Sequence, residues 1–269
     1  MESSKLKNIA LTILLITNAL LLGLTVVQQT HSRQYSQQAL LDAVELLERQ
    51  GIQVNVRDLP QGDFPAAQSL EADPDGELAD FTALLGEGTA LTQQGLVTLY
   101  SGPLGKAEVR EDGAFSVVLE PGSYPMGSQE LSAHALGVLK RMGFSAQVYE
   151  IRPGLLRAVQ VLDGVPVFSC TAALRYEQGQ LRAISGVRLL GRPAAAQESG
   201  ALSTATLLIR FRAAIIHSGD ACSAVRSATQ GYTLSTDANH NLCLIPVLRL
   251  ETDTNLYTFN AVTGEPTQE

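Results

Sequence analysis

Residue types that could do chemistry occur in several short clusters of this sequence, but none has the spacing that an active site needs. His217, Ser218 and Asp220 are the residue types of a hydrolase triad. Residues this close in sequence cannot converge on one reacting atom, however, and the chain has no GxSxG turn to expose a serine nucleophile. It also lacks the glycine-rich P-loop that cradles phosphate groups. The sequence therefore predicts a protein that is not an enzyme and has no catalytic residues.

Two stretches have part of the pattern of a calcium-binding loop. Residues 73–77 read Asp-Pro-Asp-Gly-Glu, but Leu84 stands where such a loop needs a bidentate acid. Residues 237–241 alternate oxygen ligands, but Leu242 stands where the loop needs glycine. His134 has no Asp, Glu or Cys three or four residues after it, so we expect it on a helix surface. We predict no metal site and no cofactor; the first stretch is interpreted as a turn and the second as a hairpin tip.

The three cysteines, Cys170, Cys222 and Cys243, are widely spaced and include no CxxC pair. Neither a zinc site nor a thioredoxin-like redox site is therefore indicated. Buried free thiols are the simpler interpretation. The alternative is a disulfide between Cys222 and Cys243, which an oxidising compartment outside the cytoplasm would permit.

An uncharged apolar segment runs from residue 9 to residue 27. Its length of about 19 residues is close to the roughly 20 that a helix needs to cross the hydrocarbon layer. Lys5 and Lys7 precede it and only Arg33 follows closely, which predicts a cytoplasmic N-terminus and an extracytoplasmic C-terminal domain. A cleaved signal peptide is the alternative, but residues 26–31 offer no small-x-small cleavage site. We therefore expect a single-pass protein of the cell membrane.

One face of this predicted span carries small and polar residues. Ala19 and Gly23 form a small-xxx-small pair, and Thr12 lies one heptad before Ala19. Asn18 lies near the bilayer centre, where a side-chain amide costs free energy unless it finds a partner. We interpret Thr12, Asn18, Ala19 and Gly23 as a partner-binding face. The alternative is a lone anchor that tolerates one asparagine.

The charge balance limits the partners of the domain outside the membrane. The net charge is -8, and no basic block follows the N-terminus, so binding to nucleic acid is not expected. Between residues 61 and 80 every charged residue is acidic, and two prolines interrupt the chain. This composition predicts an exposed loop or linker over 61–80.

The remaining pattern predicts helices that pack on antiparallel sheets, hence an α+β fold. A stalk helix over 34–50 carries an apolar stripe, and a half-buried strand follows it up to Leu59 and Pro60. A helix from Leu131, followed by four strands joined at Asp163-Gly164 and Gln178-Gly179, resembles in its order a second helix from Ser203 followed by three strands. Pro246 implies that its own strand is an edge or bulged. The stripe of the stalk helix is Leu40, Ala43, Val44 and Leu47.

This order predicts five segments along the chain. They are a cytoplasmic stub at 1–8, the membrane helix at 9–27, and a stalk helix with a first α/β region and the acidic loop at 28–128. A second helix-plus-meander module follows at 129–195 and a third at 196–269.

The two ends of the chain resemble the YycH/YycI family of Gram-positive membrane-anchored regulators. At the N-terminus the likeness rests on the basic start, the span, the stalk helix and the turn Gln50-Gly51-Ile52. At the C-terminus it rests on Gly231-Tyr232, the strand 245–252 and residues 257–265. This last stretch is also similar to PepSY-type domains, which commonly close on a strand, an Asn-Ala pair and Thr-Gly-Glu.

The resemblance implies a non-enzymatic regulator in cell-envelope homeostasis. Its expected partners are the membrane, a two-component sensor histidine kinase and a homologous regulator protein, contacted through the span and the extracytoplasmic modules. The alternative is a PepSY-like module that binds an extended peptide at a sheet edge or holds a protease inactive. The resemblance carries over no catalytic residue.

Overall fold

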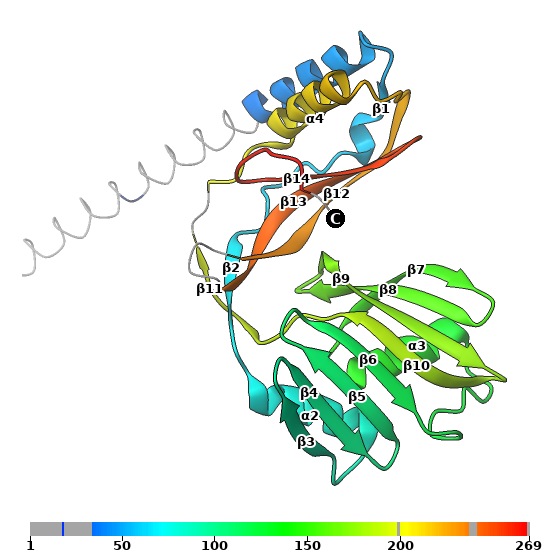
Figure 1. Ribbon diagram of the computed structural model, residues 1–269. Helices are drawn as coiled ribbons and strands as arrows, with labels where there is room; N and C mark the ends of the chain where they lie inside the picture. The colour runs from blue at the N-terminus through cyan, green and yellow to red at the C-terminus, as the bar shows by residue number, and fades with distance from the viewer. Residues whose placement is uncertain (1–17, 19–33, 198–199, 237–240, 268–269) are drawn as a thin grey trace, which may run out of the picture.

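The computed structural model describes residue 18 and residues 34–197, 200–236 and 241–267 (Figure 1). The predicted membrane segment 9–27 lies outside the described residues except for Asn18, which is helical and exposed. Within the described ranges, no helix is both long enough and apolar enough to span a membrane.

The described residues have a mixed α+β fold organised round one 14-stranded sheet, which confirms the α+β class that the sequence predicts. Figure 1 shows two lobes joined by a narrow middle. We call residues 74–190 the central lobe, and residues 34–59 with 202–267 the terminal lobe. Between them, β2 (Ala67–Glu71) pairs with β11 (Arg192–Gln197), so the chain enters and leaves the central lobe side by side.

The central lobe packs two helices on one face of a strongly curved antiparallel sheet. A single hydrophobic cluster fills the space between them and includes Phe81, Val117, Leu139 and Leu174. The helices are α2 (Pro74–Leu85) and α3 (Leu131–Arg141). The strands are β3 (Ala90–Gln94), β4 (Val97–Gly102), β5 (Gly105–Arg110), β6 (Ala114–Leu119), β7 (Ala146–Arg152), β8 (Leu155–Leu162), β9 (Val165–Glu177) and β10 (Gln180–Val187).

The two predicted hairpin turns of the central lobe are confirmed. Asp163 and Gly164 both have positive φ angles, of 49° and 84°, and so do Gln178 and Gly179, at 51° and 73°. Two central residues with positive φ define the turn whose twist matches the flanking strands. These turns fix the registers of β8 with β9 and of β9 with β10.

The terminal lobe brings the two ends of the described chain into one core. Residues 34–48 form the stalk helix, which lies beside α4 (Thr204–Ser218) in Figure 1. The predicted stripe is confirmed, because Leu40, Ala43, Val44 and Leu47 are buried in one cluster with Leu207, Leu208 and Phe211. The sheet under the two helices consists of β1 (Gln53–Val54), β12 (Ala224–Thr236), β13 (Leu242–Thr252) and β14 (Leu256–Asn260).

The predicted strand after the stalk helix is shorter than expected. Only Gln53 and Val54 extend, as β1, in parallel with the start of β12. Residues Val56–Asp58 form a short 3₁₀ helix, η1, because the Asn55 side chain accepts a hydrogen bond from the Arg57 backbone N–H and turns the chain. Leu59 is nevertheless buried in the terminal lobe.

The prediction of a loop over 61–80 holds only for residues 61–66, which lie outside any helix or strand. It is wrong for the rest, which contains β2 and the first half of α2, and the turn expected at 73–77 is the start of that helix. Asp73 caps α2 by accepting a hydrogen bond from the Gly76 backbone N–H, and Pro74 occupies the first helical turn, where its missing N–H costs nothing. Three of the acidic residues that favoured a loop, Asp73, Asp75 and Glu77, therefore stabilise the positive end of a helix dipole.

Pro246 lies inside the sheet instead of on an edge or at a bulge. It faces Tyr232 on β12 within an unbroken stretch of register. On the other side of β13, β2 pairs with residues 243 and 244 and β14 with residues from Val247 onward. Pro246 stands in the gap between these two partners, where no strand requires the N–H that proline lacks.

The hydrophobic clusters divide the chain differently from the predicted segments. The boundary predicted between residues 128 and 129 falls inside the central-lobe cluster, which combines Tyr100 and Val117 with Val138 and Leu156. The stalk helix, grouped in the prediction with the region that follows it, shares its cluster with the C-terminal module. The central lobe is thus inserted into the terminal lobe.

Candidate functional site

A cleft of about 290 Å³ opens where the central lobe meets the β2–β11 pair, and we call it the Arg188 cleft. It combines one face of α2, the turn between α3 and β7, the end of β8, and the segment that joins β10 to β11. Its lining residues are Asp73, Gly76, Glu77, Asp80, Gly143, Ser145, Gln160, Val161, Leu162, Arg188, Leu189, Gly191, Arg192 and Pro193.

Three carboxylates reach the cleft from one side of α2. Asp73, Glu77 and Asp80 are separated by four and three residues, the spacing that places side chains on one helix face. Asp73 is also the residue that caps the helix, so its position is fixed by the backbone. The start of α2 therefore presents a fixed acidic row to the opposite wall.

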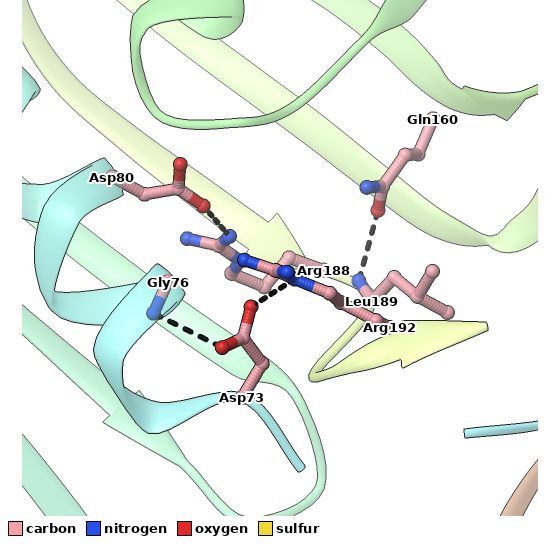
Figure 2. Close-up of polar contacts among 7 residues, drawn as sticks. All are labelled: Asp73, Gly76, Asp80, Gln160, Arg188, Leu189 and Arg192. Carbon is pink, nitrogen blue, oxygen red and sulfur yellow. Dashed lines mark hydrogen bonds and ion pairs between the residues drawn. The ribbon is translucent and has the colours of Figure 1, made fainter. Parts of the chain in front are cut away.

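Two arginines from the β10–β11 segment meet this row (Figure 2). Arg188 Nη2 lies 2.7 Å from Asp80 Oδ2, and Arg192 Nε forms an ion pair with Asp73 Oδ2. Gln160 on β8 fixes the same segment, because its Oε1 accepts a hydrogen bond of 2.8 Å from the Leu189 backbone N–H. These contacts tie α2 and β8 of the central lobe to the chain that leaves it.

Arg188 is the most deeply buried cation of the cleft, with 4% of its side chain exposed. Its guanidinium lies over the Phe81 ring, with the Cζ atom 5.1 Å from the ring centroid, and Phe81 stacks on Tyr100. Its Nε and Nη1 atoms have no hydrogen-bond partner among the described residues. The ion pair with Asp80 and the aromatic face are therefore the contacts that offset the desolvation of this charge.

Burial changes the acidity of two groups beside Arg188. It raises the pKa of Glu77 above its ordinary value, against the opposing attraction of Arg188. Burial likewise raises the pKa of the Tyr100 hydroxyl, and the negative charge of Glu77 adds to this effect. Both groups therefore hold their protons more firmly than the same groups in water.

Two glycines allow the walls of the cleft to approach closely. Gly143 has a φ of +69°, and a Cβ there would collide with the Asp80 carboxylate. Gly191 has a φ of +79°, and a Cβ there would collide with the Glu71 carbonyl oxygen. Both turns therefore need glycine to bring the acidic and basic walls together.

The arrangement is suited to holding or recognising charged groups. The lining contains no His and no Cys, and among the described residues the Ser145 hydroxyl makes no hydrogen bond to a base. Across the described ranges, no group of three or more His, Cys, Asp or Glu side chains could hold a metal ion. The cleft thus offers ion pairing and hydrogen bonding to a ligand or to a neighbouring segment.

A second cavity, of about 630 Å³, lies beside the start of the stalk helix. Ser36, Gln37 and Leu40 form one wall, residues 60–64 another, and residues 201–205 at the start of α4 a third. Its described lining includes no cation, His or Cys, so this cavity offers shape, neutral hydrogen-bonding groups and the carboxylate of Asp63.

The predicted partner-binding face cannot be compared with these cavities. Thr12, Ala19 and Gly23 lie outside the described residues, and of this face only Asn18 is described. The triad-like residues lie at the end of α4, where the Ser218 hydroxyl donates to the Ile215 carbonyl oxygen. Asp220 accepts a hydrogen bond of 2.7 Å from the Tyr257 hydroxyl.

The expectation of a surface position for His134 is wrong. Its helix, α3, turns Ala135 and Val138 into the core, and His134 is buried beside them. Its Nδ1 lies 2.9 Å from the Tyr176 hydroxyl, which supplies the hydrogen bond that a buried imidazole needs. Burial, together with the nearby charge of Arg141, lowers the pKa of His134.

The three cysteines are free, as the simpler interpretation predicted, although only Cys170 is fully buried. The alternative disulfide is wrong. Cys222 precedes β12, whereas Cys243 pairs with Ser235 at the other end of the same strand. The length of β12 separates the two thiols, and a disulfide needs Cα atoms within about 7 Å.

The Arg188 cleft is not predictable from local sequence patterns, because its walls are far apart along the chain. Asp80 and Arg188 are separated by 108 residues, and no local spacing connects them. One signal was present, since Arg188 interrupts the apolar run Val187 to Leu190. A cation in a buried run needs a carboxylate partner, and the uniformly acidic segment 61–80 was the place to look for it.

Comparisons with known proteins give a fold likeness without a family. No protein-family model and no curated protein matches the chain. It is similar to the crystal structure of an uncharacterised protein from Eubacterium rectale, with a TM-score of 0.51 and 10% identity, over 81% of this chain and 90% of that one. It also aligns with the YpeB C-terminal domain of Bacillus megaterium at 13% identity, over 75% of this chain and 100% of that one. The TM-score of 0.31 for this second pair carries no argument, so the likeness that stands is one of fold, to the Eubacterium rectale protein.

Proposed function

We propose that the protein is a non-enzymatic, membrane-anchored extracytoplasmic regulator of a two-component sensor histidine kinase. The predicted span at 9–27 would place it in the cell membrane beside the kinase, with residues 1–8 in the cytoplasm. The resemblance of both chain ends to the YycH/YycI family motivates this partner. A homologous regulator protein is a further expected partner on the same grounds.

One observation carries the proposal, namely the packing of the stalk helix against the terminal lobe. Leu40, Val44 and Leu47 are buried in the same cluster as the α4 residues Leu207 and Phe211. Each fully buried Leu or Val side chain contributes about 1.5–3 kcal/mol, so the helix is held firmly to the lobe. A shift of a membrane segment joined to this helix would therefore move the terminal lobe with it.

The Arg188 cleft supports a role in binding instead of catalysis. Its charged side chains are engaged with one another, as Asp80 with the buried Arg188 and Asp73 with the exposed Arg192. Groups held in ion pairs stabilise an arrangement of segments, whereas a catalytic acid or base must be free to exchange its proton with a substrate. The cleft thus favours a protein whose output is a change of contact between surfaces.

The test is crosslinking of the full chain to its partners in native membranes. A variant carrying Asn18→Leu and Gly23→Leu should lose most recovery of a sensor histidine kinase, because both changes remove the small and polar face of the span. Leu21→Ile, on the opposite face, is the matched control and should leave recovery unchanged. Equal recovery of the kinase with both variants would show that the span does not form the contact.

A second candidate function is a PepSY-like module that binds an extended peptide or holds a protease inactive. The observation in its favour is the presence of unpaired strand edges at β3 and β7, since each pairs with one neighbour among the described strands. Binding of peptides that survives the two span substitutions, together with inhibition of a co-purified protease, would favour this function over kinase control.

A further inference from the structure

The free edges of the sheet differ sharply in how they are protected against pairing with another strand. Natural sheets protect an edge with charged side chains, proline, a bulge or a covering segment. On β14, the tail covers the edge, since the Asn260 N–H donates to the Glu265 carbonyl and the Thr267 N–H donates to the Thr258 carbonyl. On β11, Pro193 and a register shift interrupt the strand.

The edge strand β7 is protected by its own side chains. Its register with β8 shifts between Val148 and Glu150, which marks a bulge. Glu150 forms ion pairs with Arg152 on the same strand and with Arg157 on β8. A strand added here would have to desolvate these charges and match an irregular backbone.

The edge strand β3 has none of these protections. Its five residues, Ala-Leu-Thr-Gln-Gln, include no charge, proline or glycine, and all five are exposed. It pairs with β4 residue by residue without a register shift. Leu91 on the strand is 45% exposed and Leu96 in the adjoining turn is 68% exposed. Figure 1 shows β3 at the outer end of the central lobe, away from the stalk helix.

We propose that β3 is a self-association edge, at which two copies of the chain join their sheets through an antiparallel β3–β3 pair. A two-fold axis through Thr92 pairs all five residues of one copy with all five of the other. Leu91 then lies opposite Gln93 of the partner subunit, and Ala90 lies opposite Gln94 of the partner subunit. The two central threonines face one another, which is a favourable cross-strand pair.

The composition of β3 favours a second copy as the occupant. Across a two-fold axis a strand meets its own side chains, so a charged residue near the axis would face a like charge. β3 and β14 both lack charge and keep an unbroken register, but the tail covers β14, whereas no described segment hydrogen-bonds to the outer edge of β3. In this register an odd-numbered residue lies opposite an odd-numbered residue and an even-numbered one opposite an even-numbered one. The helix-covered faces of the two sheets therefore lie on the same side of the joined sheet.

The pairing buries less area than a standard interface of about 1,600 Å², so we expect a dimer with a dissociation constant in the micromolar range. It adds backbone hydrogen bonds along five residues and covers Leu91 from the solvent. Neither lobe has to change its fold for the two edges to meet.

Site-directed disulfides test the register. The full chain is prepared with Cys222 and Cys243 replaced by serine, while Cys170 is kept, because burial raises the pKa of its thiol to about 12 and leaves it unreactive. Thr92→Cys should then form a covalent dimer on mild oxidation. Ala90→Cys should not do so alone, because the two copies of residue 90 are about 13 Å apart along the strands. Mixing Ala90→Cys with Gln94→Cys should restore crosslinking.

A charge exchange tests whether the contact drives association. Leu91→Lys with Gln93→Lys places like charges opposite one another twice. It should raise the dissociation constant of the dimer by about tenfold, measured by sedimentation equilibrium of the full chain. Leu91→Lys with Gln93→Glu places opposite charges there and should leave it within about threefold of the unchanged protein. Both variants substitute the same two positions, so a difference between them reports the sign of the facing charges and not the loss of Leu91 or Gln93.

Crosslinking at Thr92→Cys that equals crosslinking of Tyr149→Cys on β7 would overturn the proposal, because random collision would then explain both. Identical dissociation constants for the two charge variants would also overturn it. If a strand of a different protein pairs with β3 while this chain stays monomeric, that protein and not a second copy is the partner of β3. This result would also refute self-association.

Discussion

The two lobes solve the same packing problem with different stretches of chain. Each covers one face of an antiparallel sheet with two helices, α2 and α3 in the central lobe and the stalk helix with α4 in the terminal lobe. The central lobe is built from one continuous segment. The terminal lobe must bring residues before position 60 together with residues after position 200. The difference teaches that a disturbance at the N-terminus reaches the C-terminal strands before it reaches the central lobe.

The largest effect should come from breaking the central lobe alone. Phe81→Ala removes a fully buried ring that stacks on Tyr100, with 4.3 Å between the ring centroids. The same ring also lies under the guanidinium of Arg188. We expect a loss of about 3–5 kcal/mol in the free energy of unfolding. Hydrogen exchange should quicken in β4–β6 and α3 and stay slow in β12–β14. Uniform loss of protection would show that the lobes unfold as one unit.

A slightly smaller effect should follow from separating the stalk helix from the terminal lobe. Leu47→Ala empties a fully buried site in that cluster and should cost about 2–4 kcal/mol. Exchange should then quicken in α4 and β12–β14 first. Leu46→Ala, at an exposed position on the same helix, is the matched control and should cost well under 1 kcal/mol. Similar losses for both variants would contradict the described packing.

Cutting the ionic tie at the Arg188 cleft should cost less than opening either core. Asp80→Asn leaves Arg188 buried without its ion-pair partner, and 30% exposure of Asp80 lowers the cost to about 2 kcal/mol. Limited proteolysis should detect faster cleavage in the segment between β10 and β11. Asp75→Asn, at an exposed position in the first turn of the same helix, removes only a contribution to the helix dipole. It should cost well under 1 kcal/mol and leave the cleavage rate of this segment unchanged.

The smallest effect should depend on pH. Because burial raises the pKa of Glu77, the folded protein holds this proton more firmly than the unfolded chain. The stability from this group is present at low pH and is lost as the pH rises above the ordinary value of a glutamate. Glu77→Gln should therefore raise the free energy of unfolding at pH 7 by less than about 1 kcal/mol, which thermal unfolding would detect as a higher melting temperature. Near pH 4 the same substitution should change the melting temperature little. A larger gain at pH 4 would contradict this assignment.

Local signals in the sequence were sufficient for much of the fold. Asp163-Gly164 and Gln178-Gly179 specify turn geometry by themselves, and the stripe Leu40 to Leu47 specifies which side of its helix is buried. Two kinds of feature could not be read in this way. A run of acidic residues such as 73–80 occurs both in exposed loops and at the start of helices, so its composition does not separate the two structures. Only the role of Asp73 as a helix cap distinguishes a helix start from a loop here. The Arg188 cleft depends on contacts between distant segments, which no local period records.

The pairing of β2 with β11 has a consequence for the design of the molecule. Glu71 lies opposite Arg192, so the points where the chain enters and leaves the central lobe are neighbours on adjacent strands. A tight hairpin turn from Glu71 to Arg192 would span this distance, so the two connections alone would allow the central lobe to be removed or replaced by another domain. Such a replacement would also have to cover Tyr232 and Leu244, because they pack in one buried cluster with Val167 of the central lobe, where β9 pairs with β12.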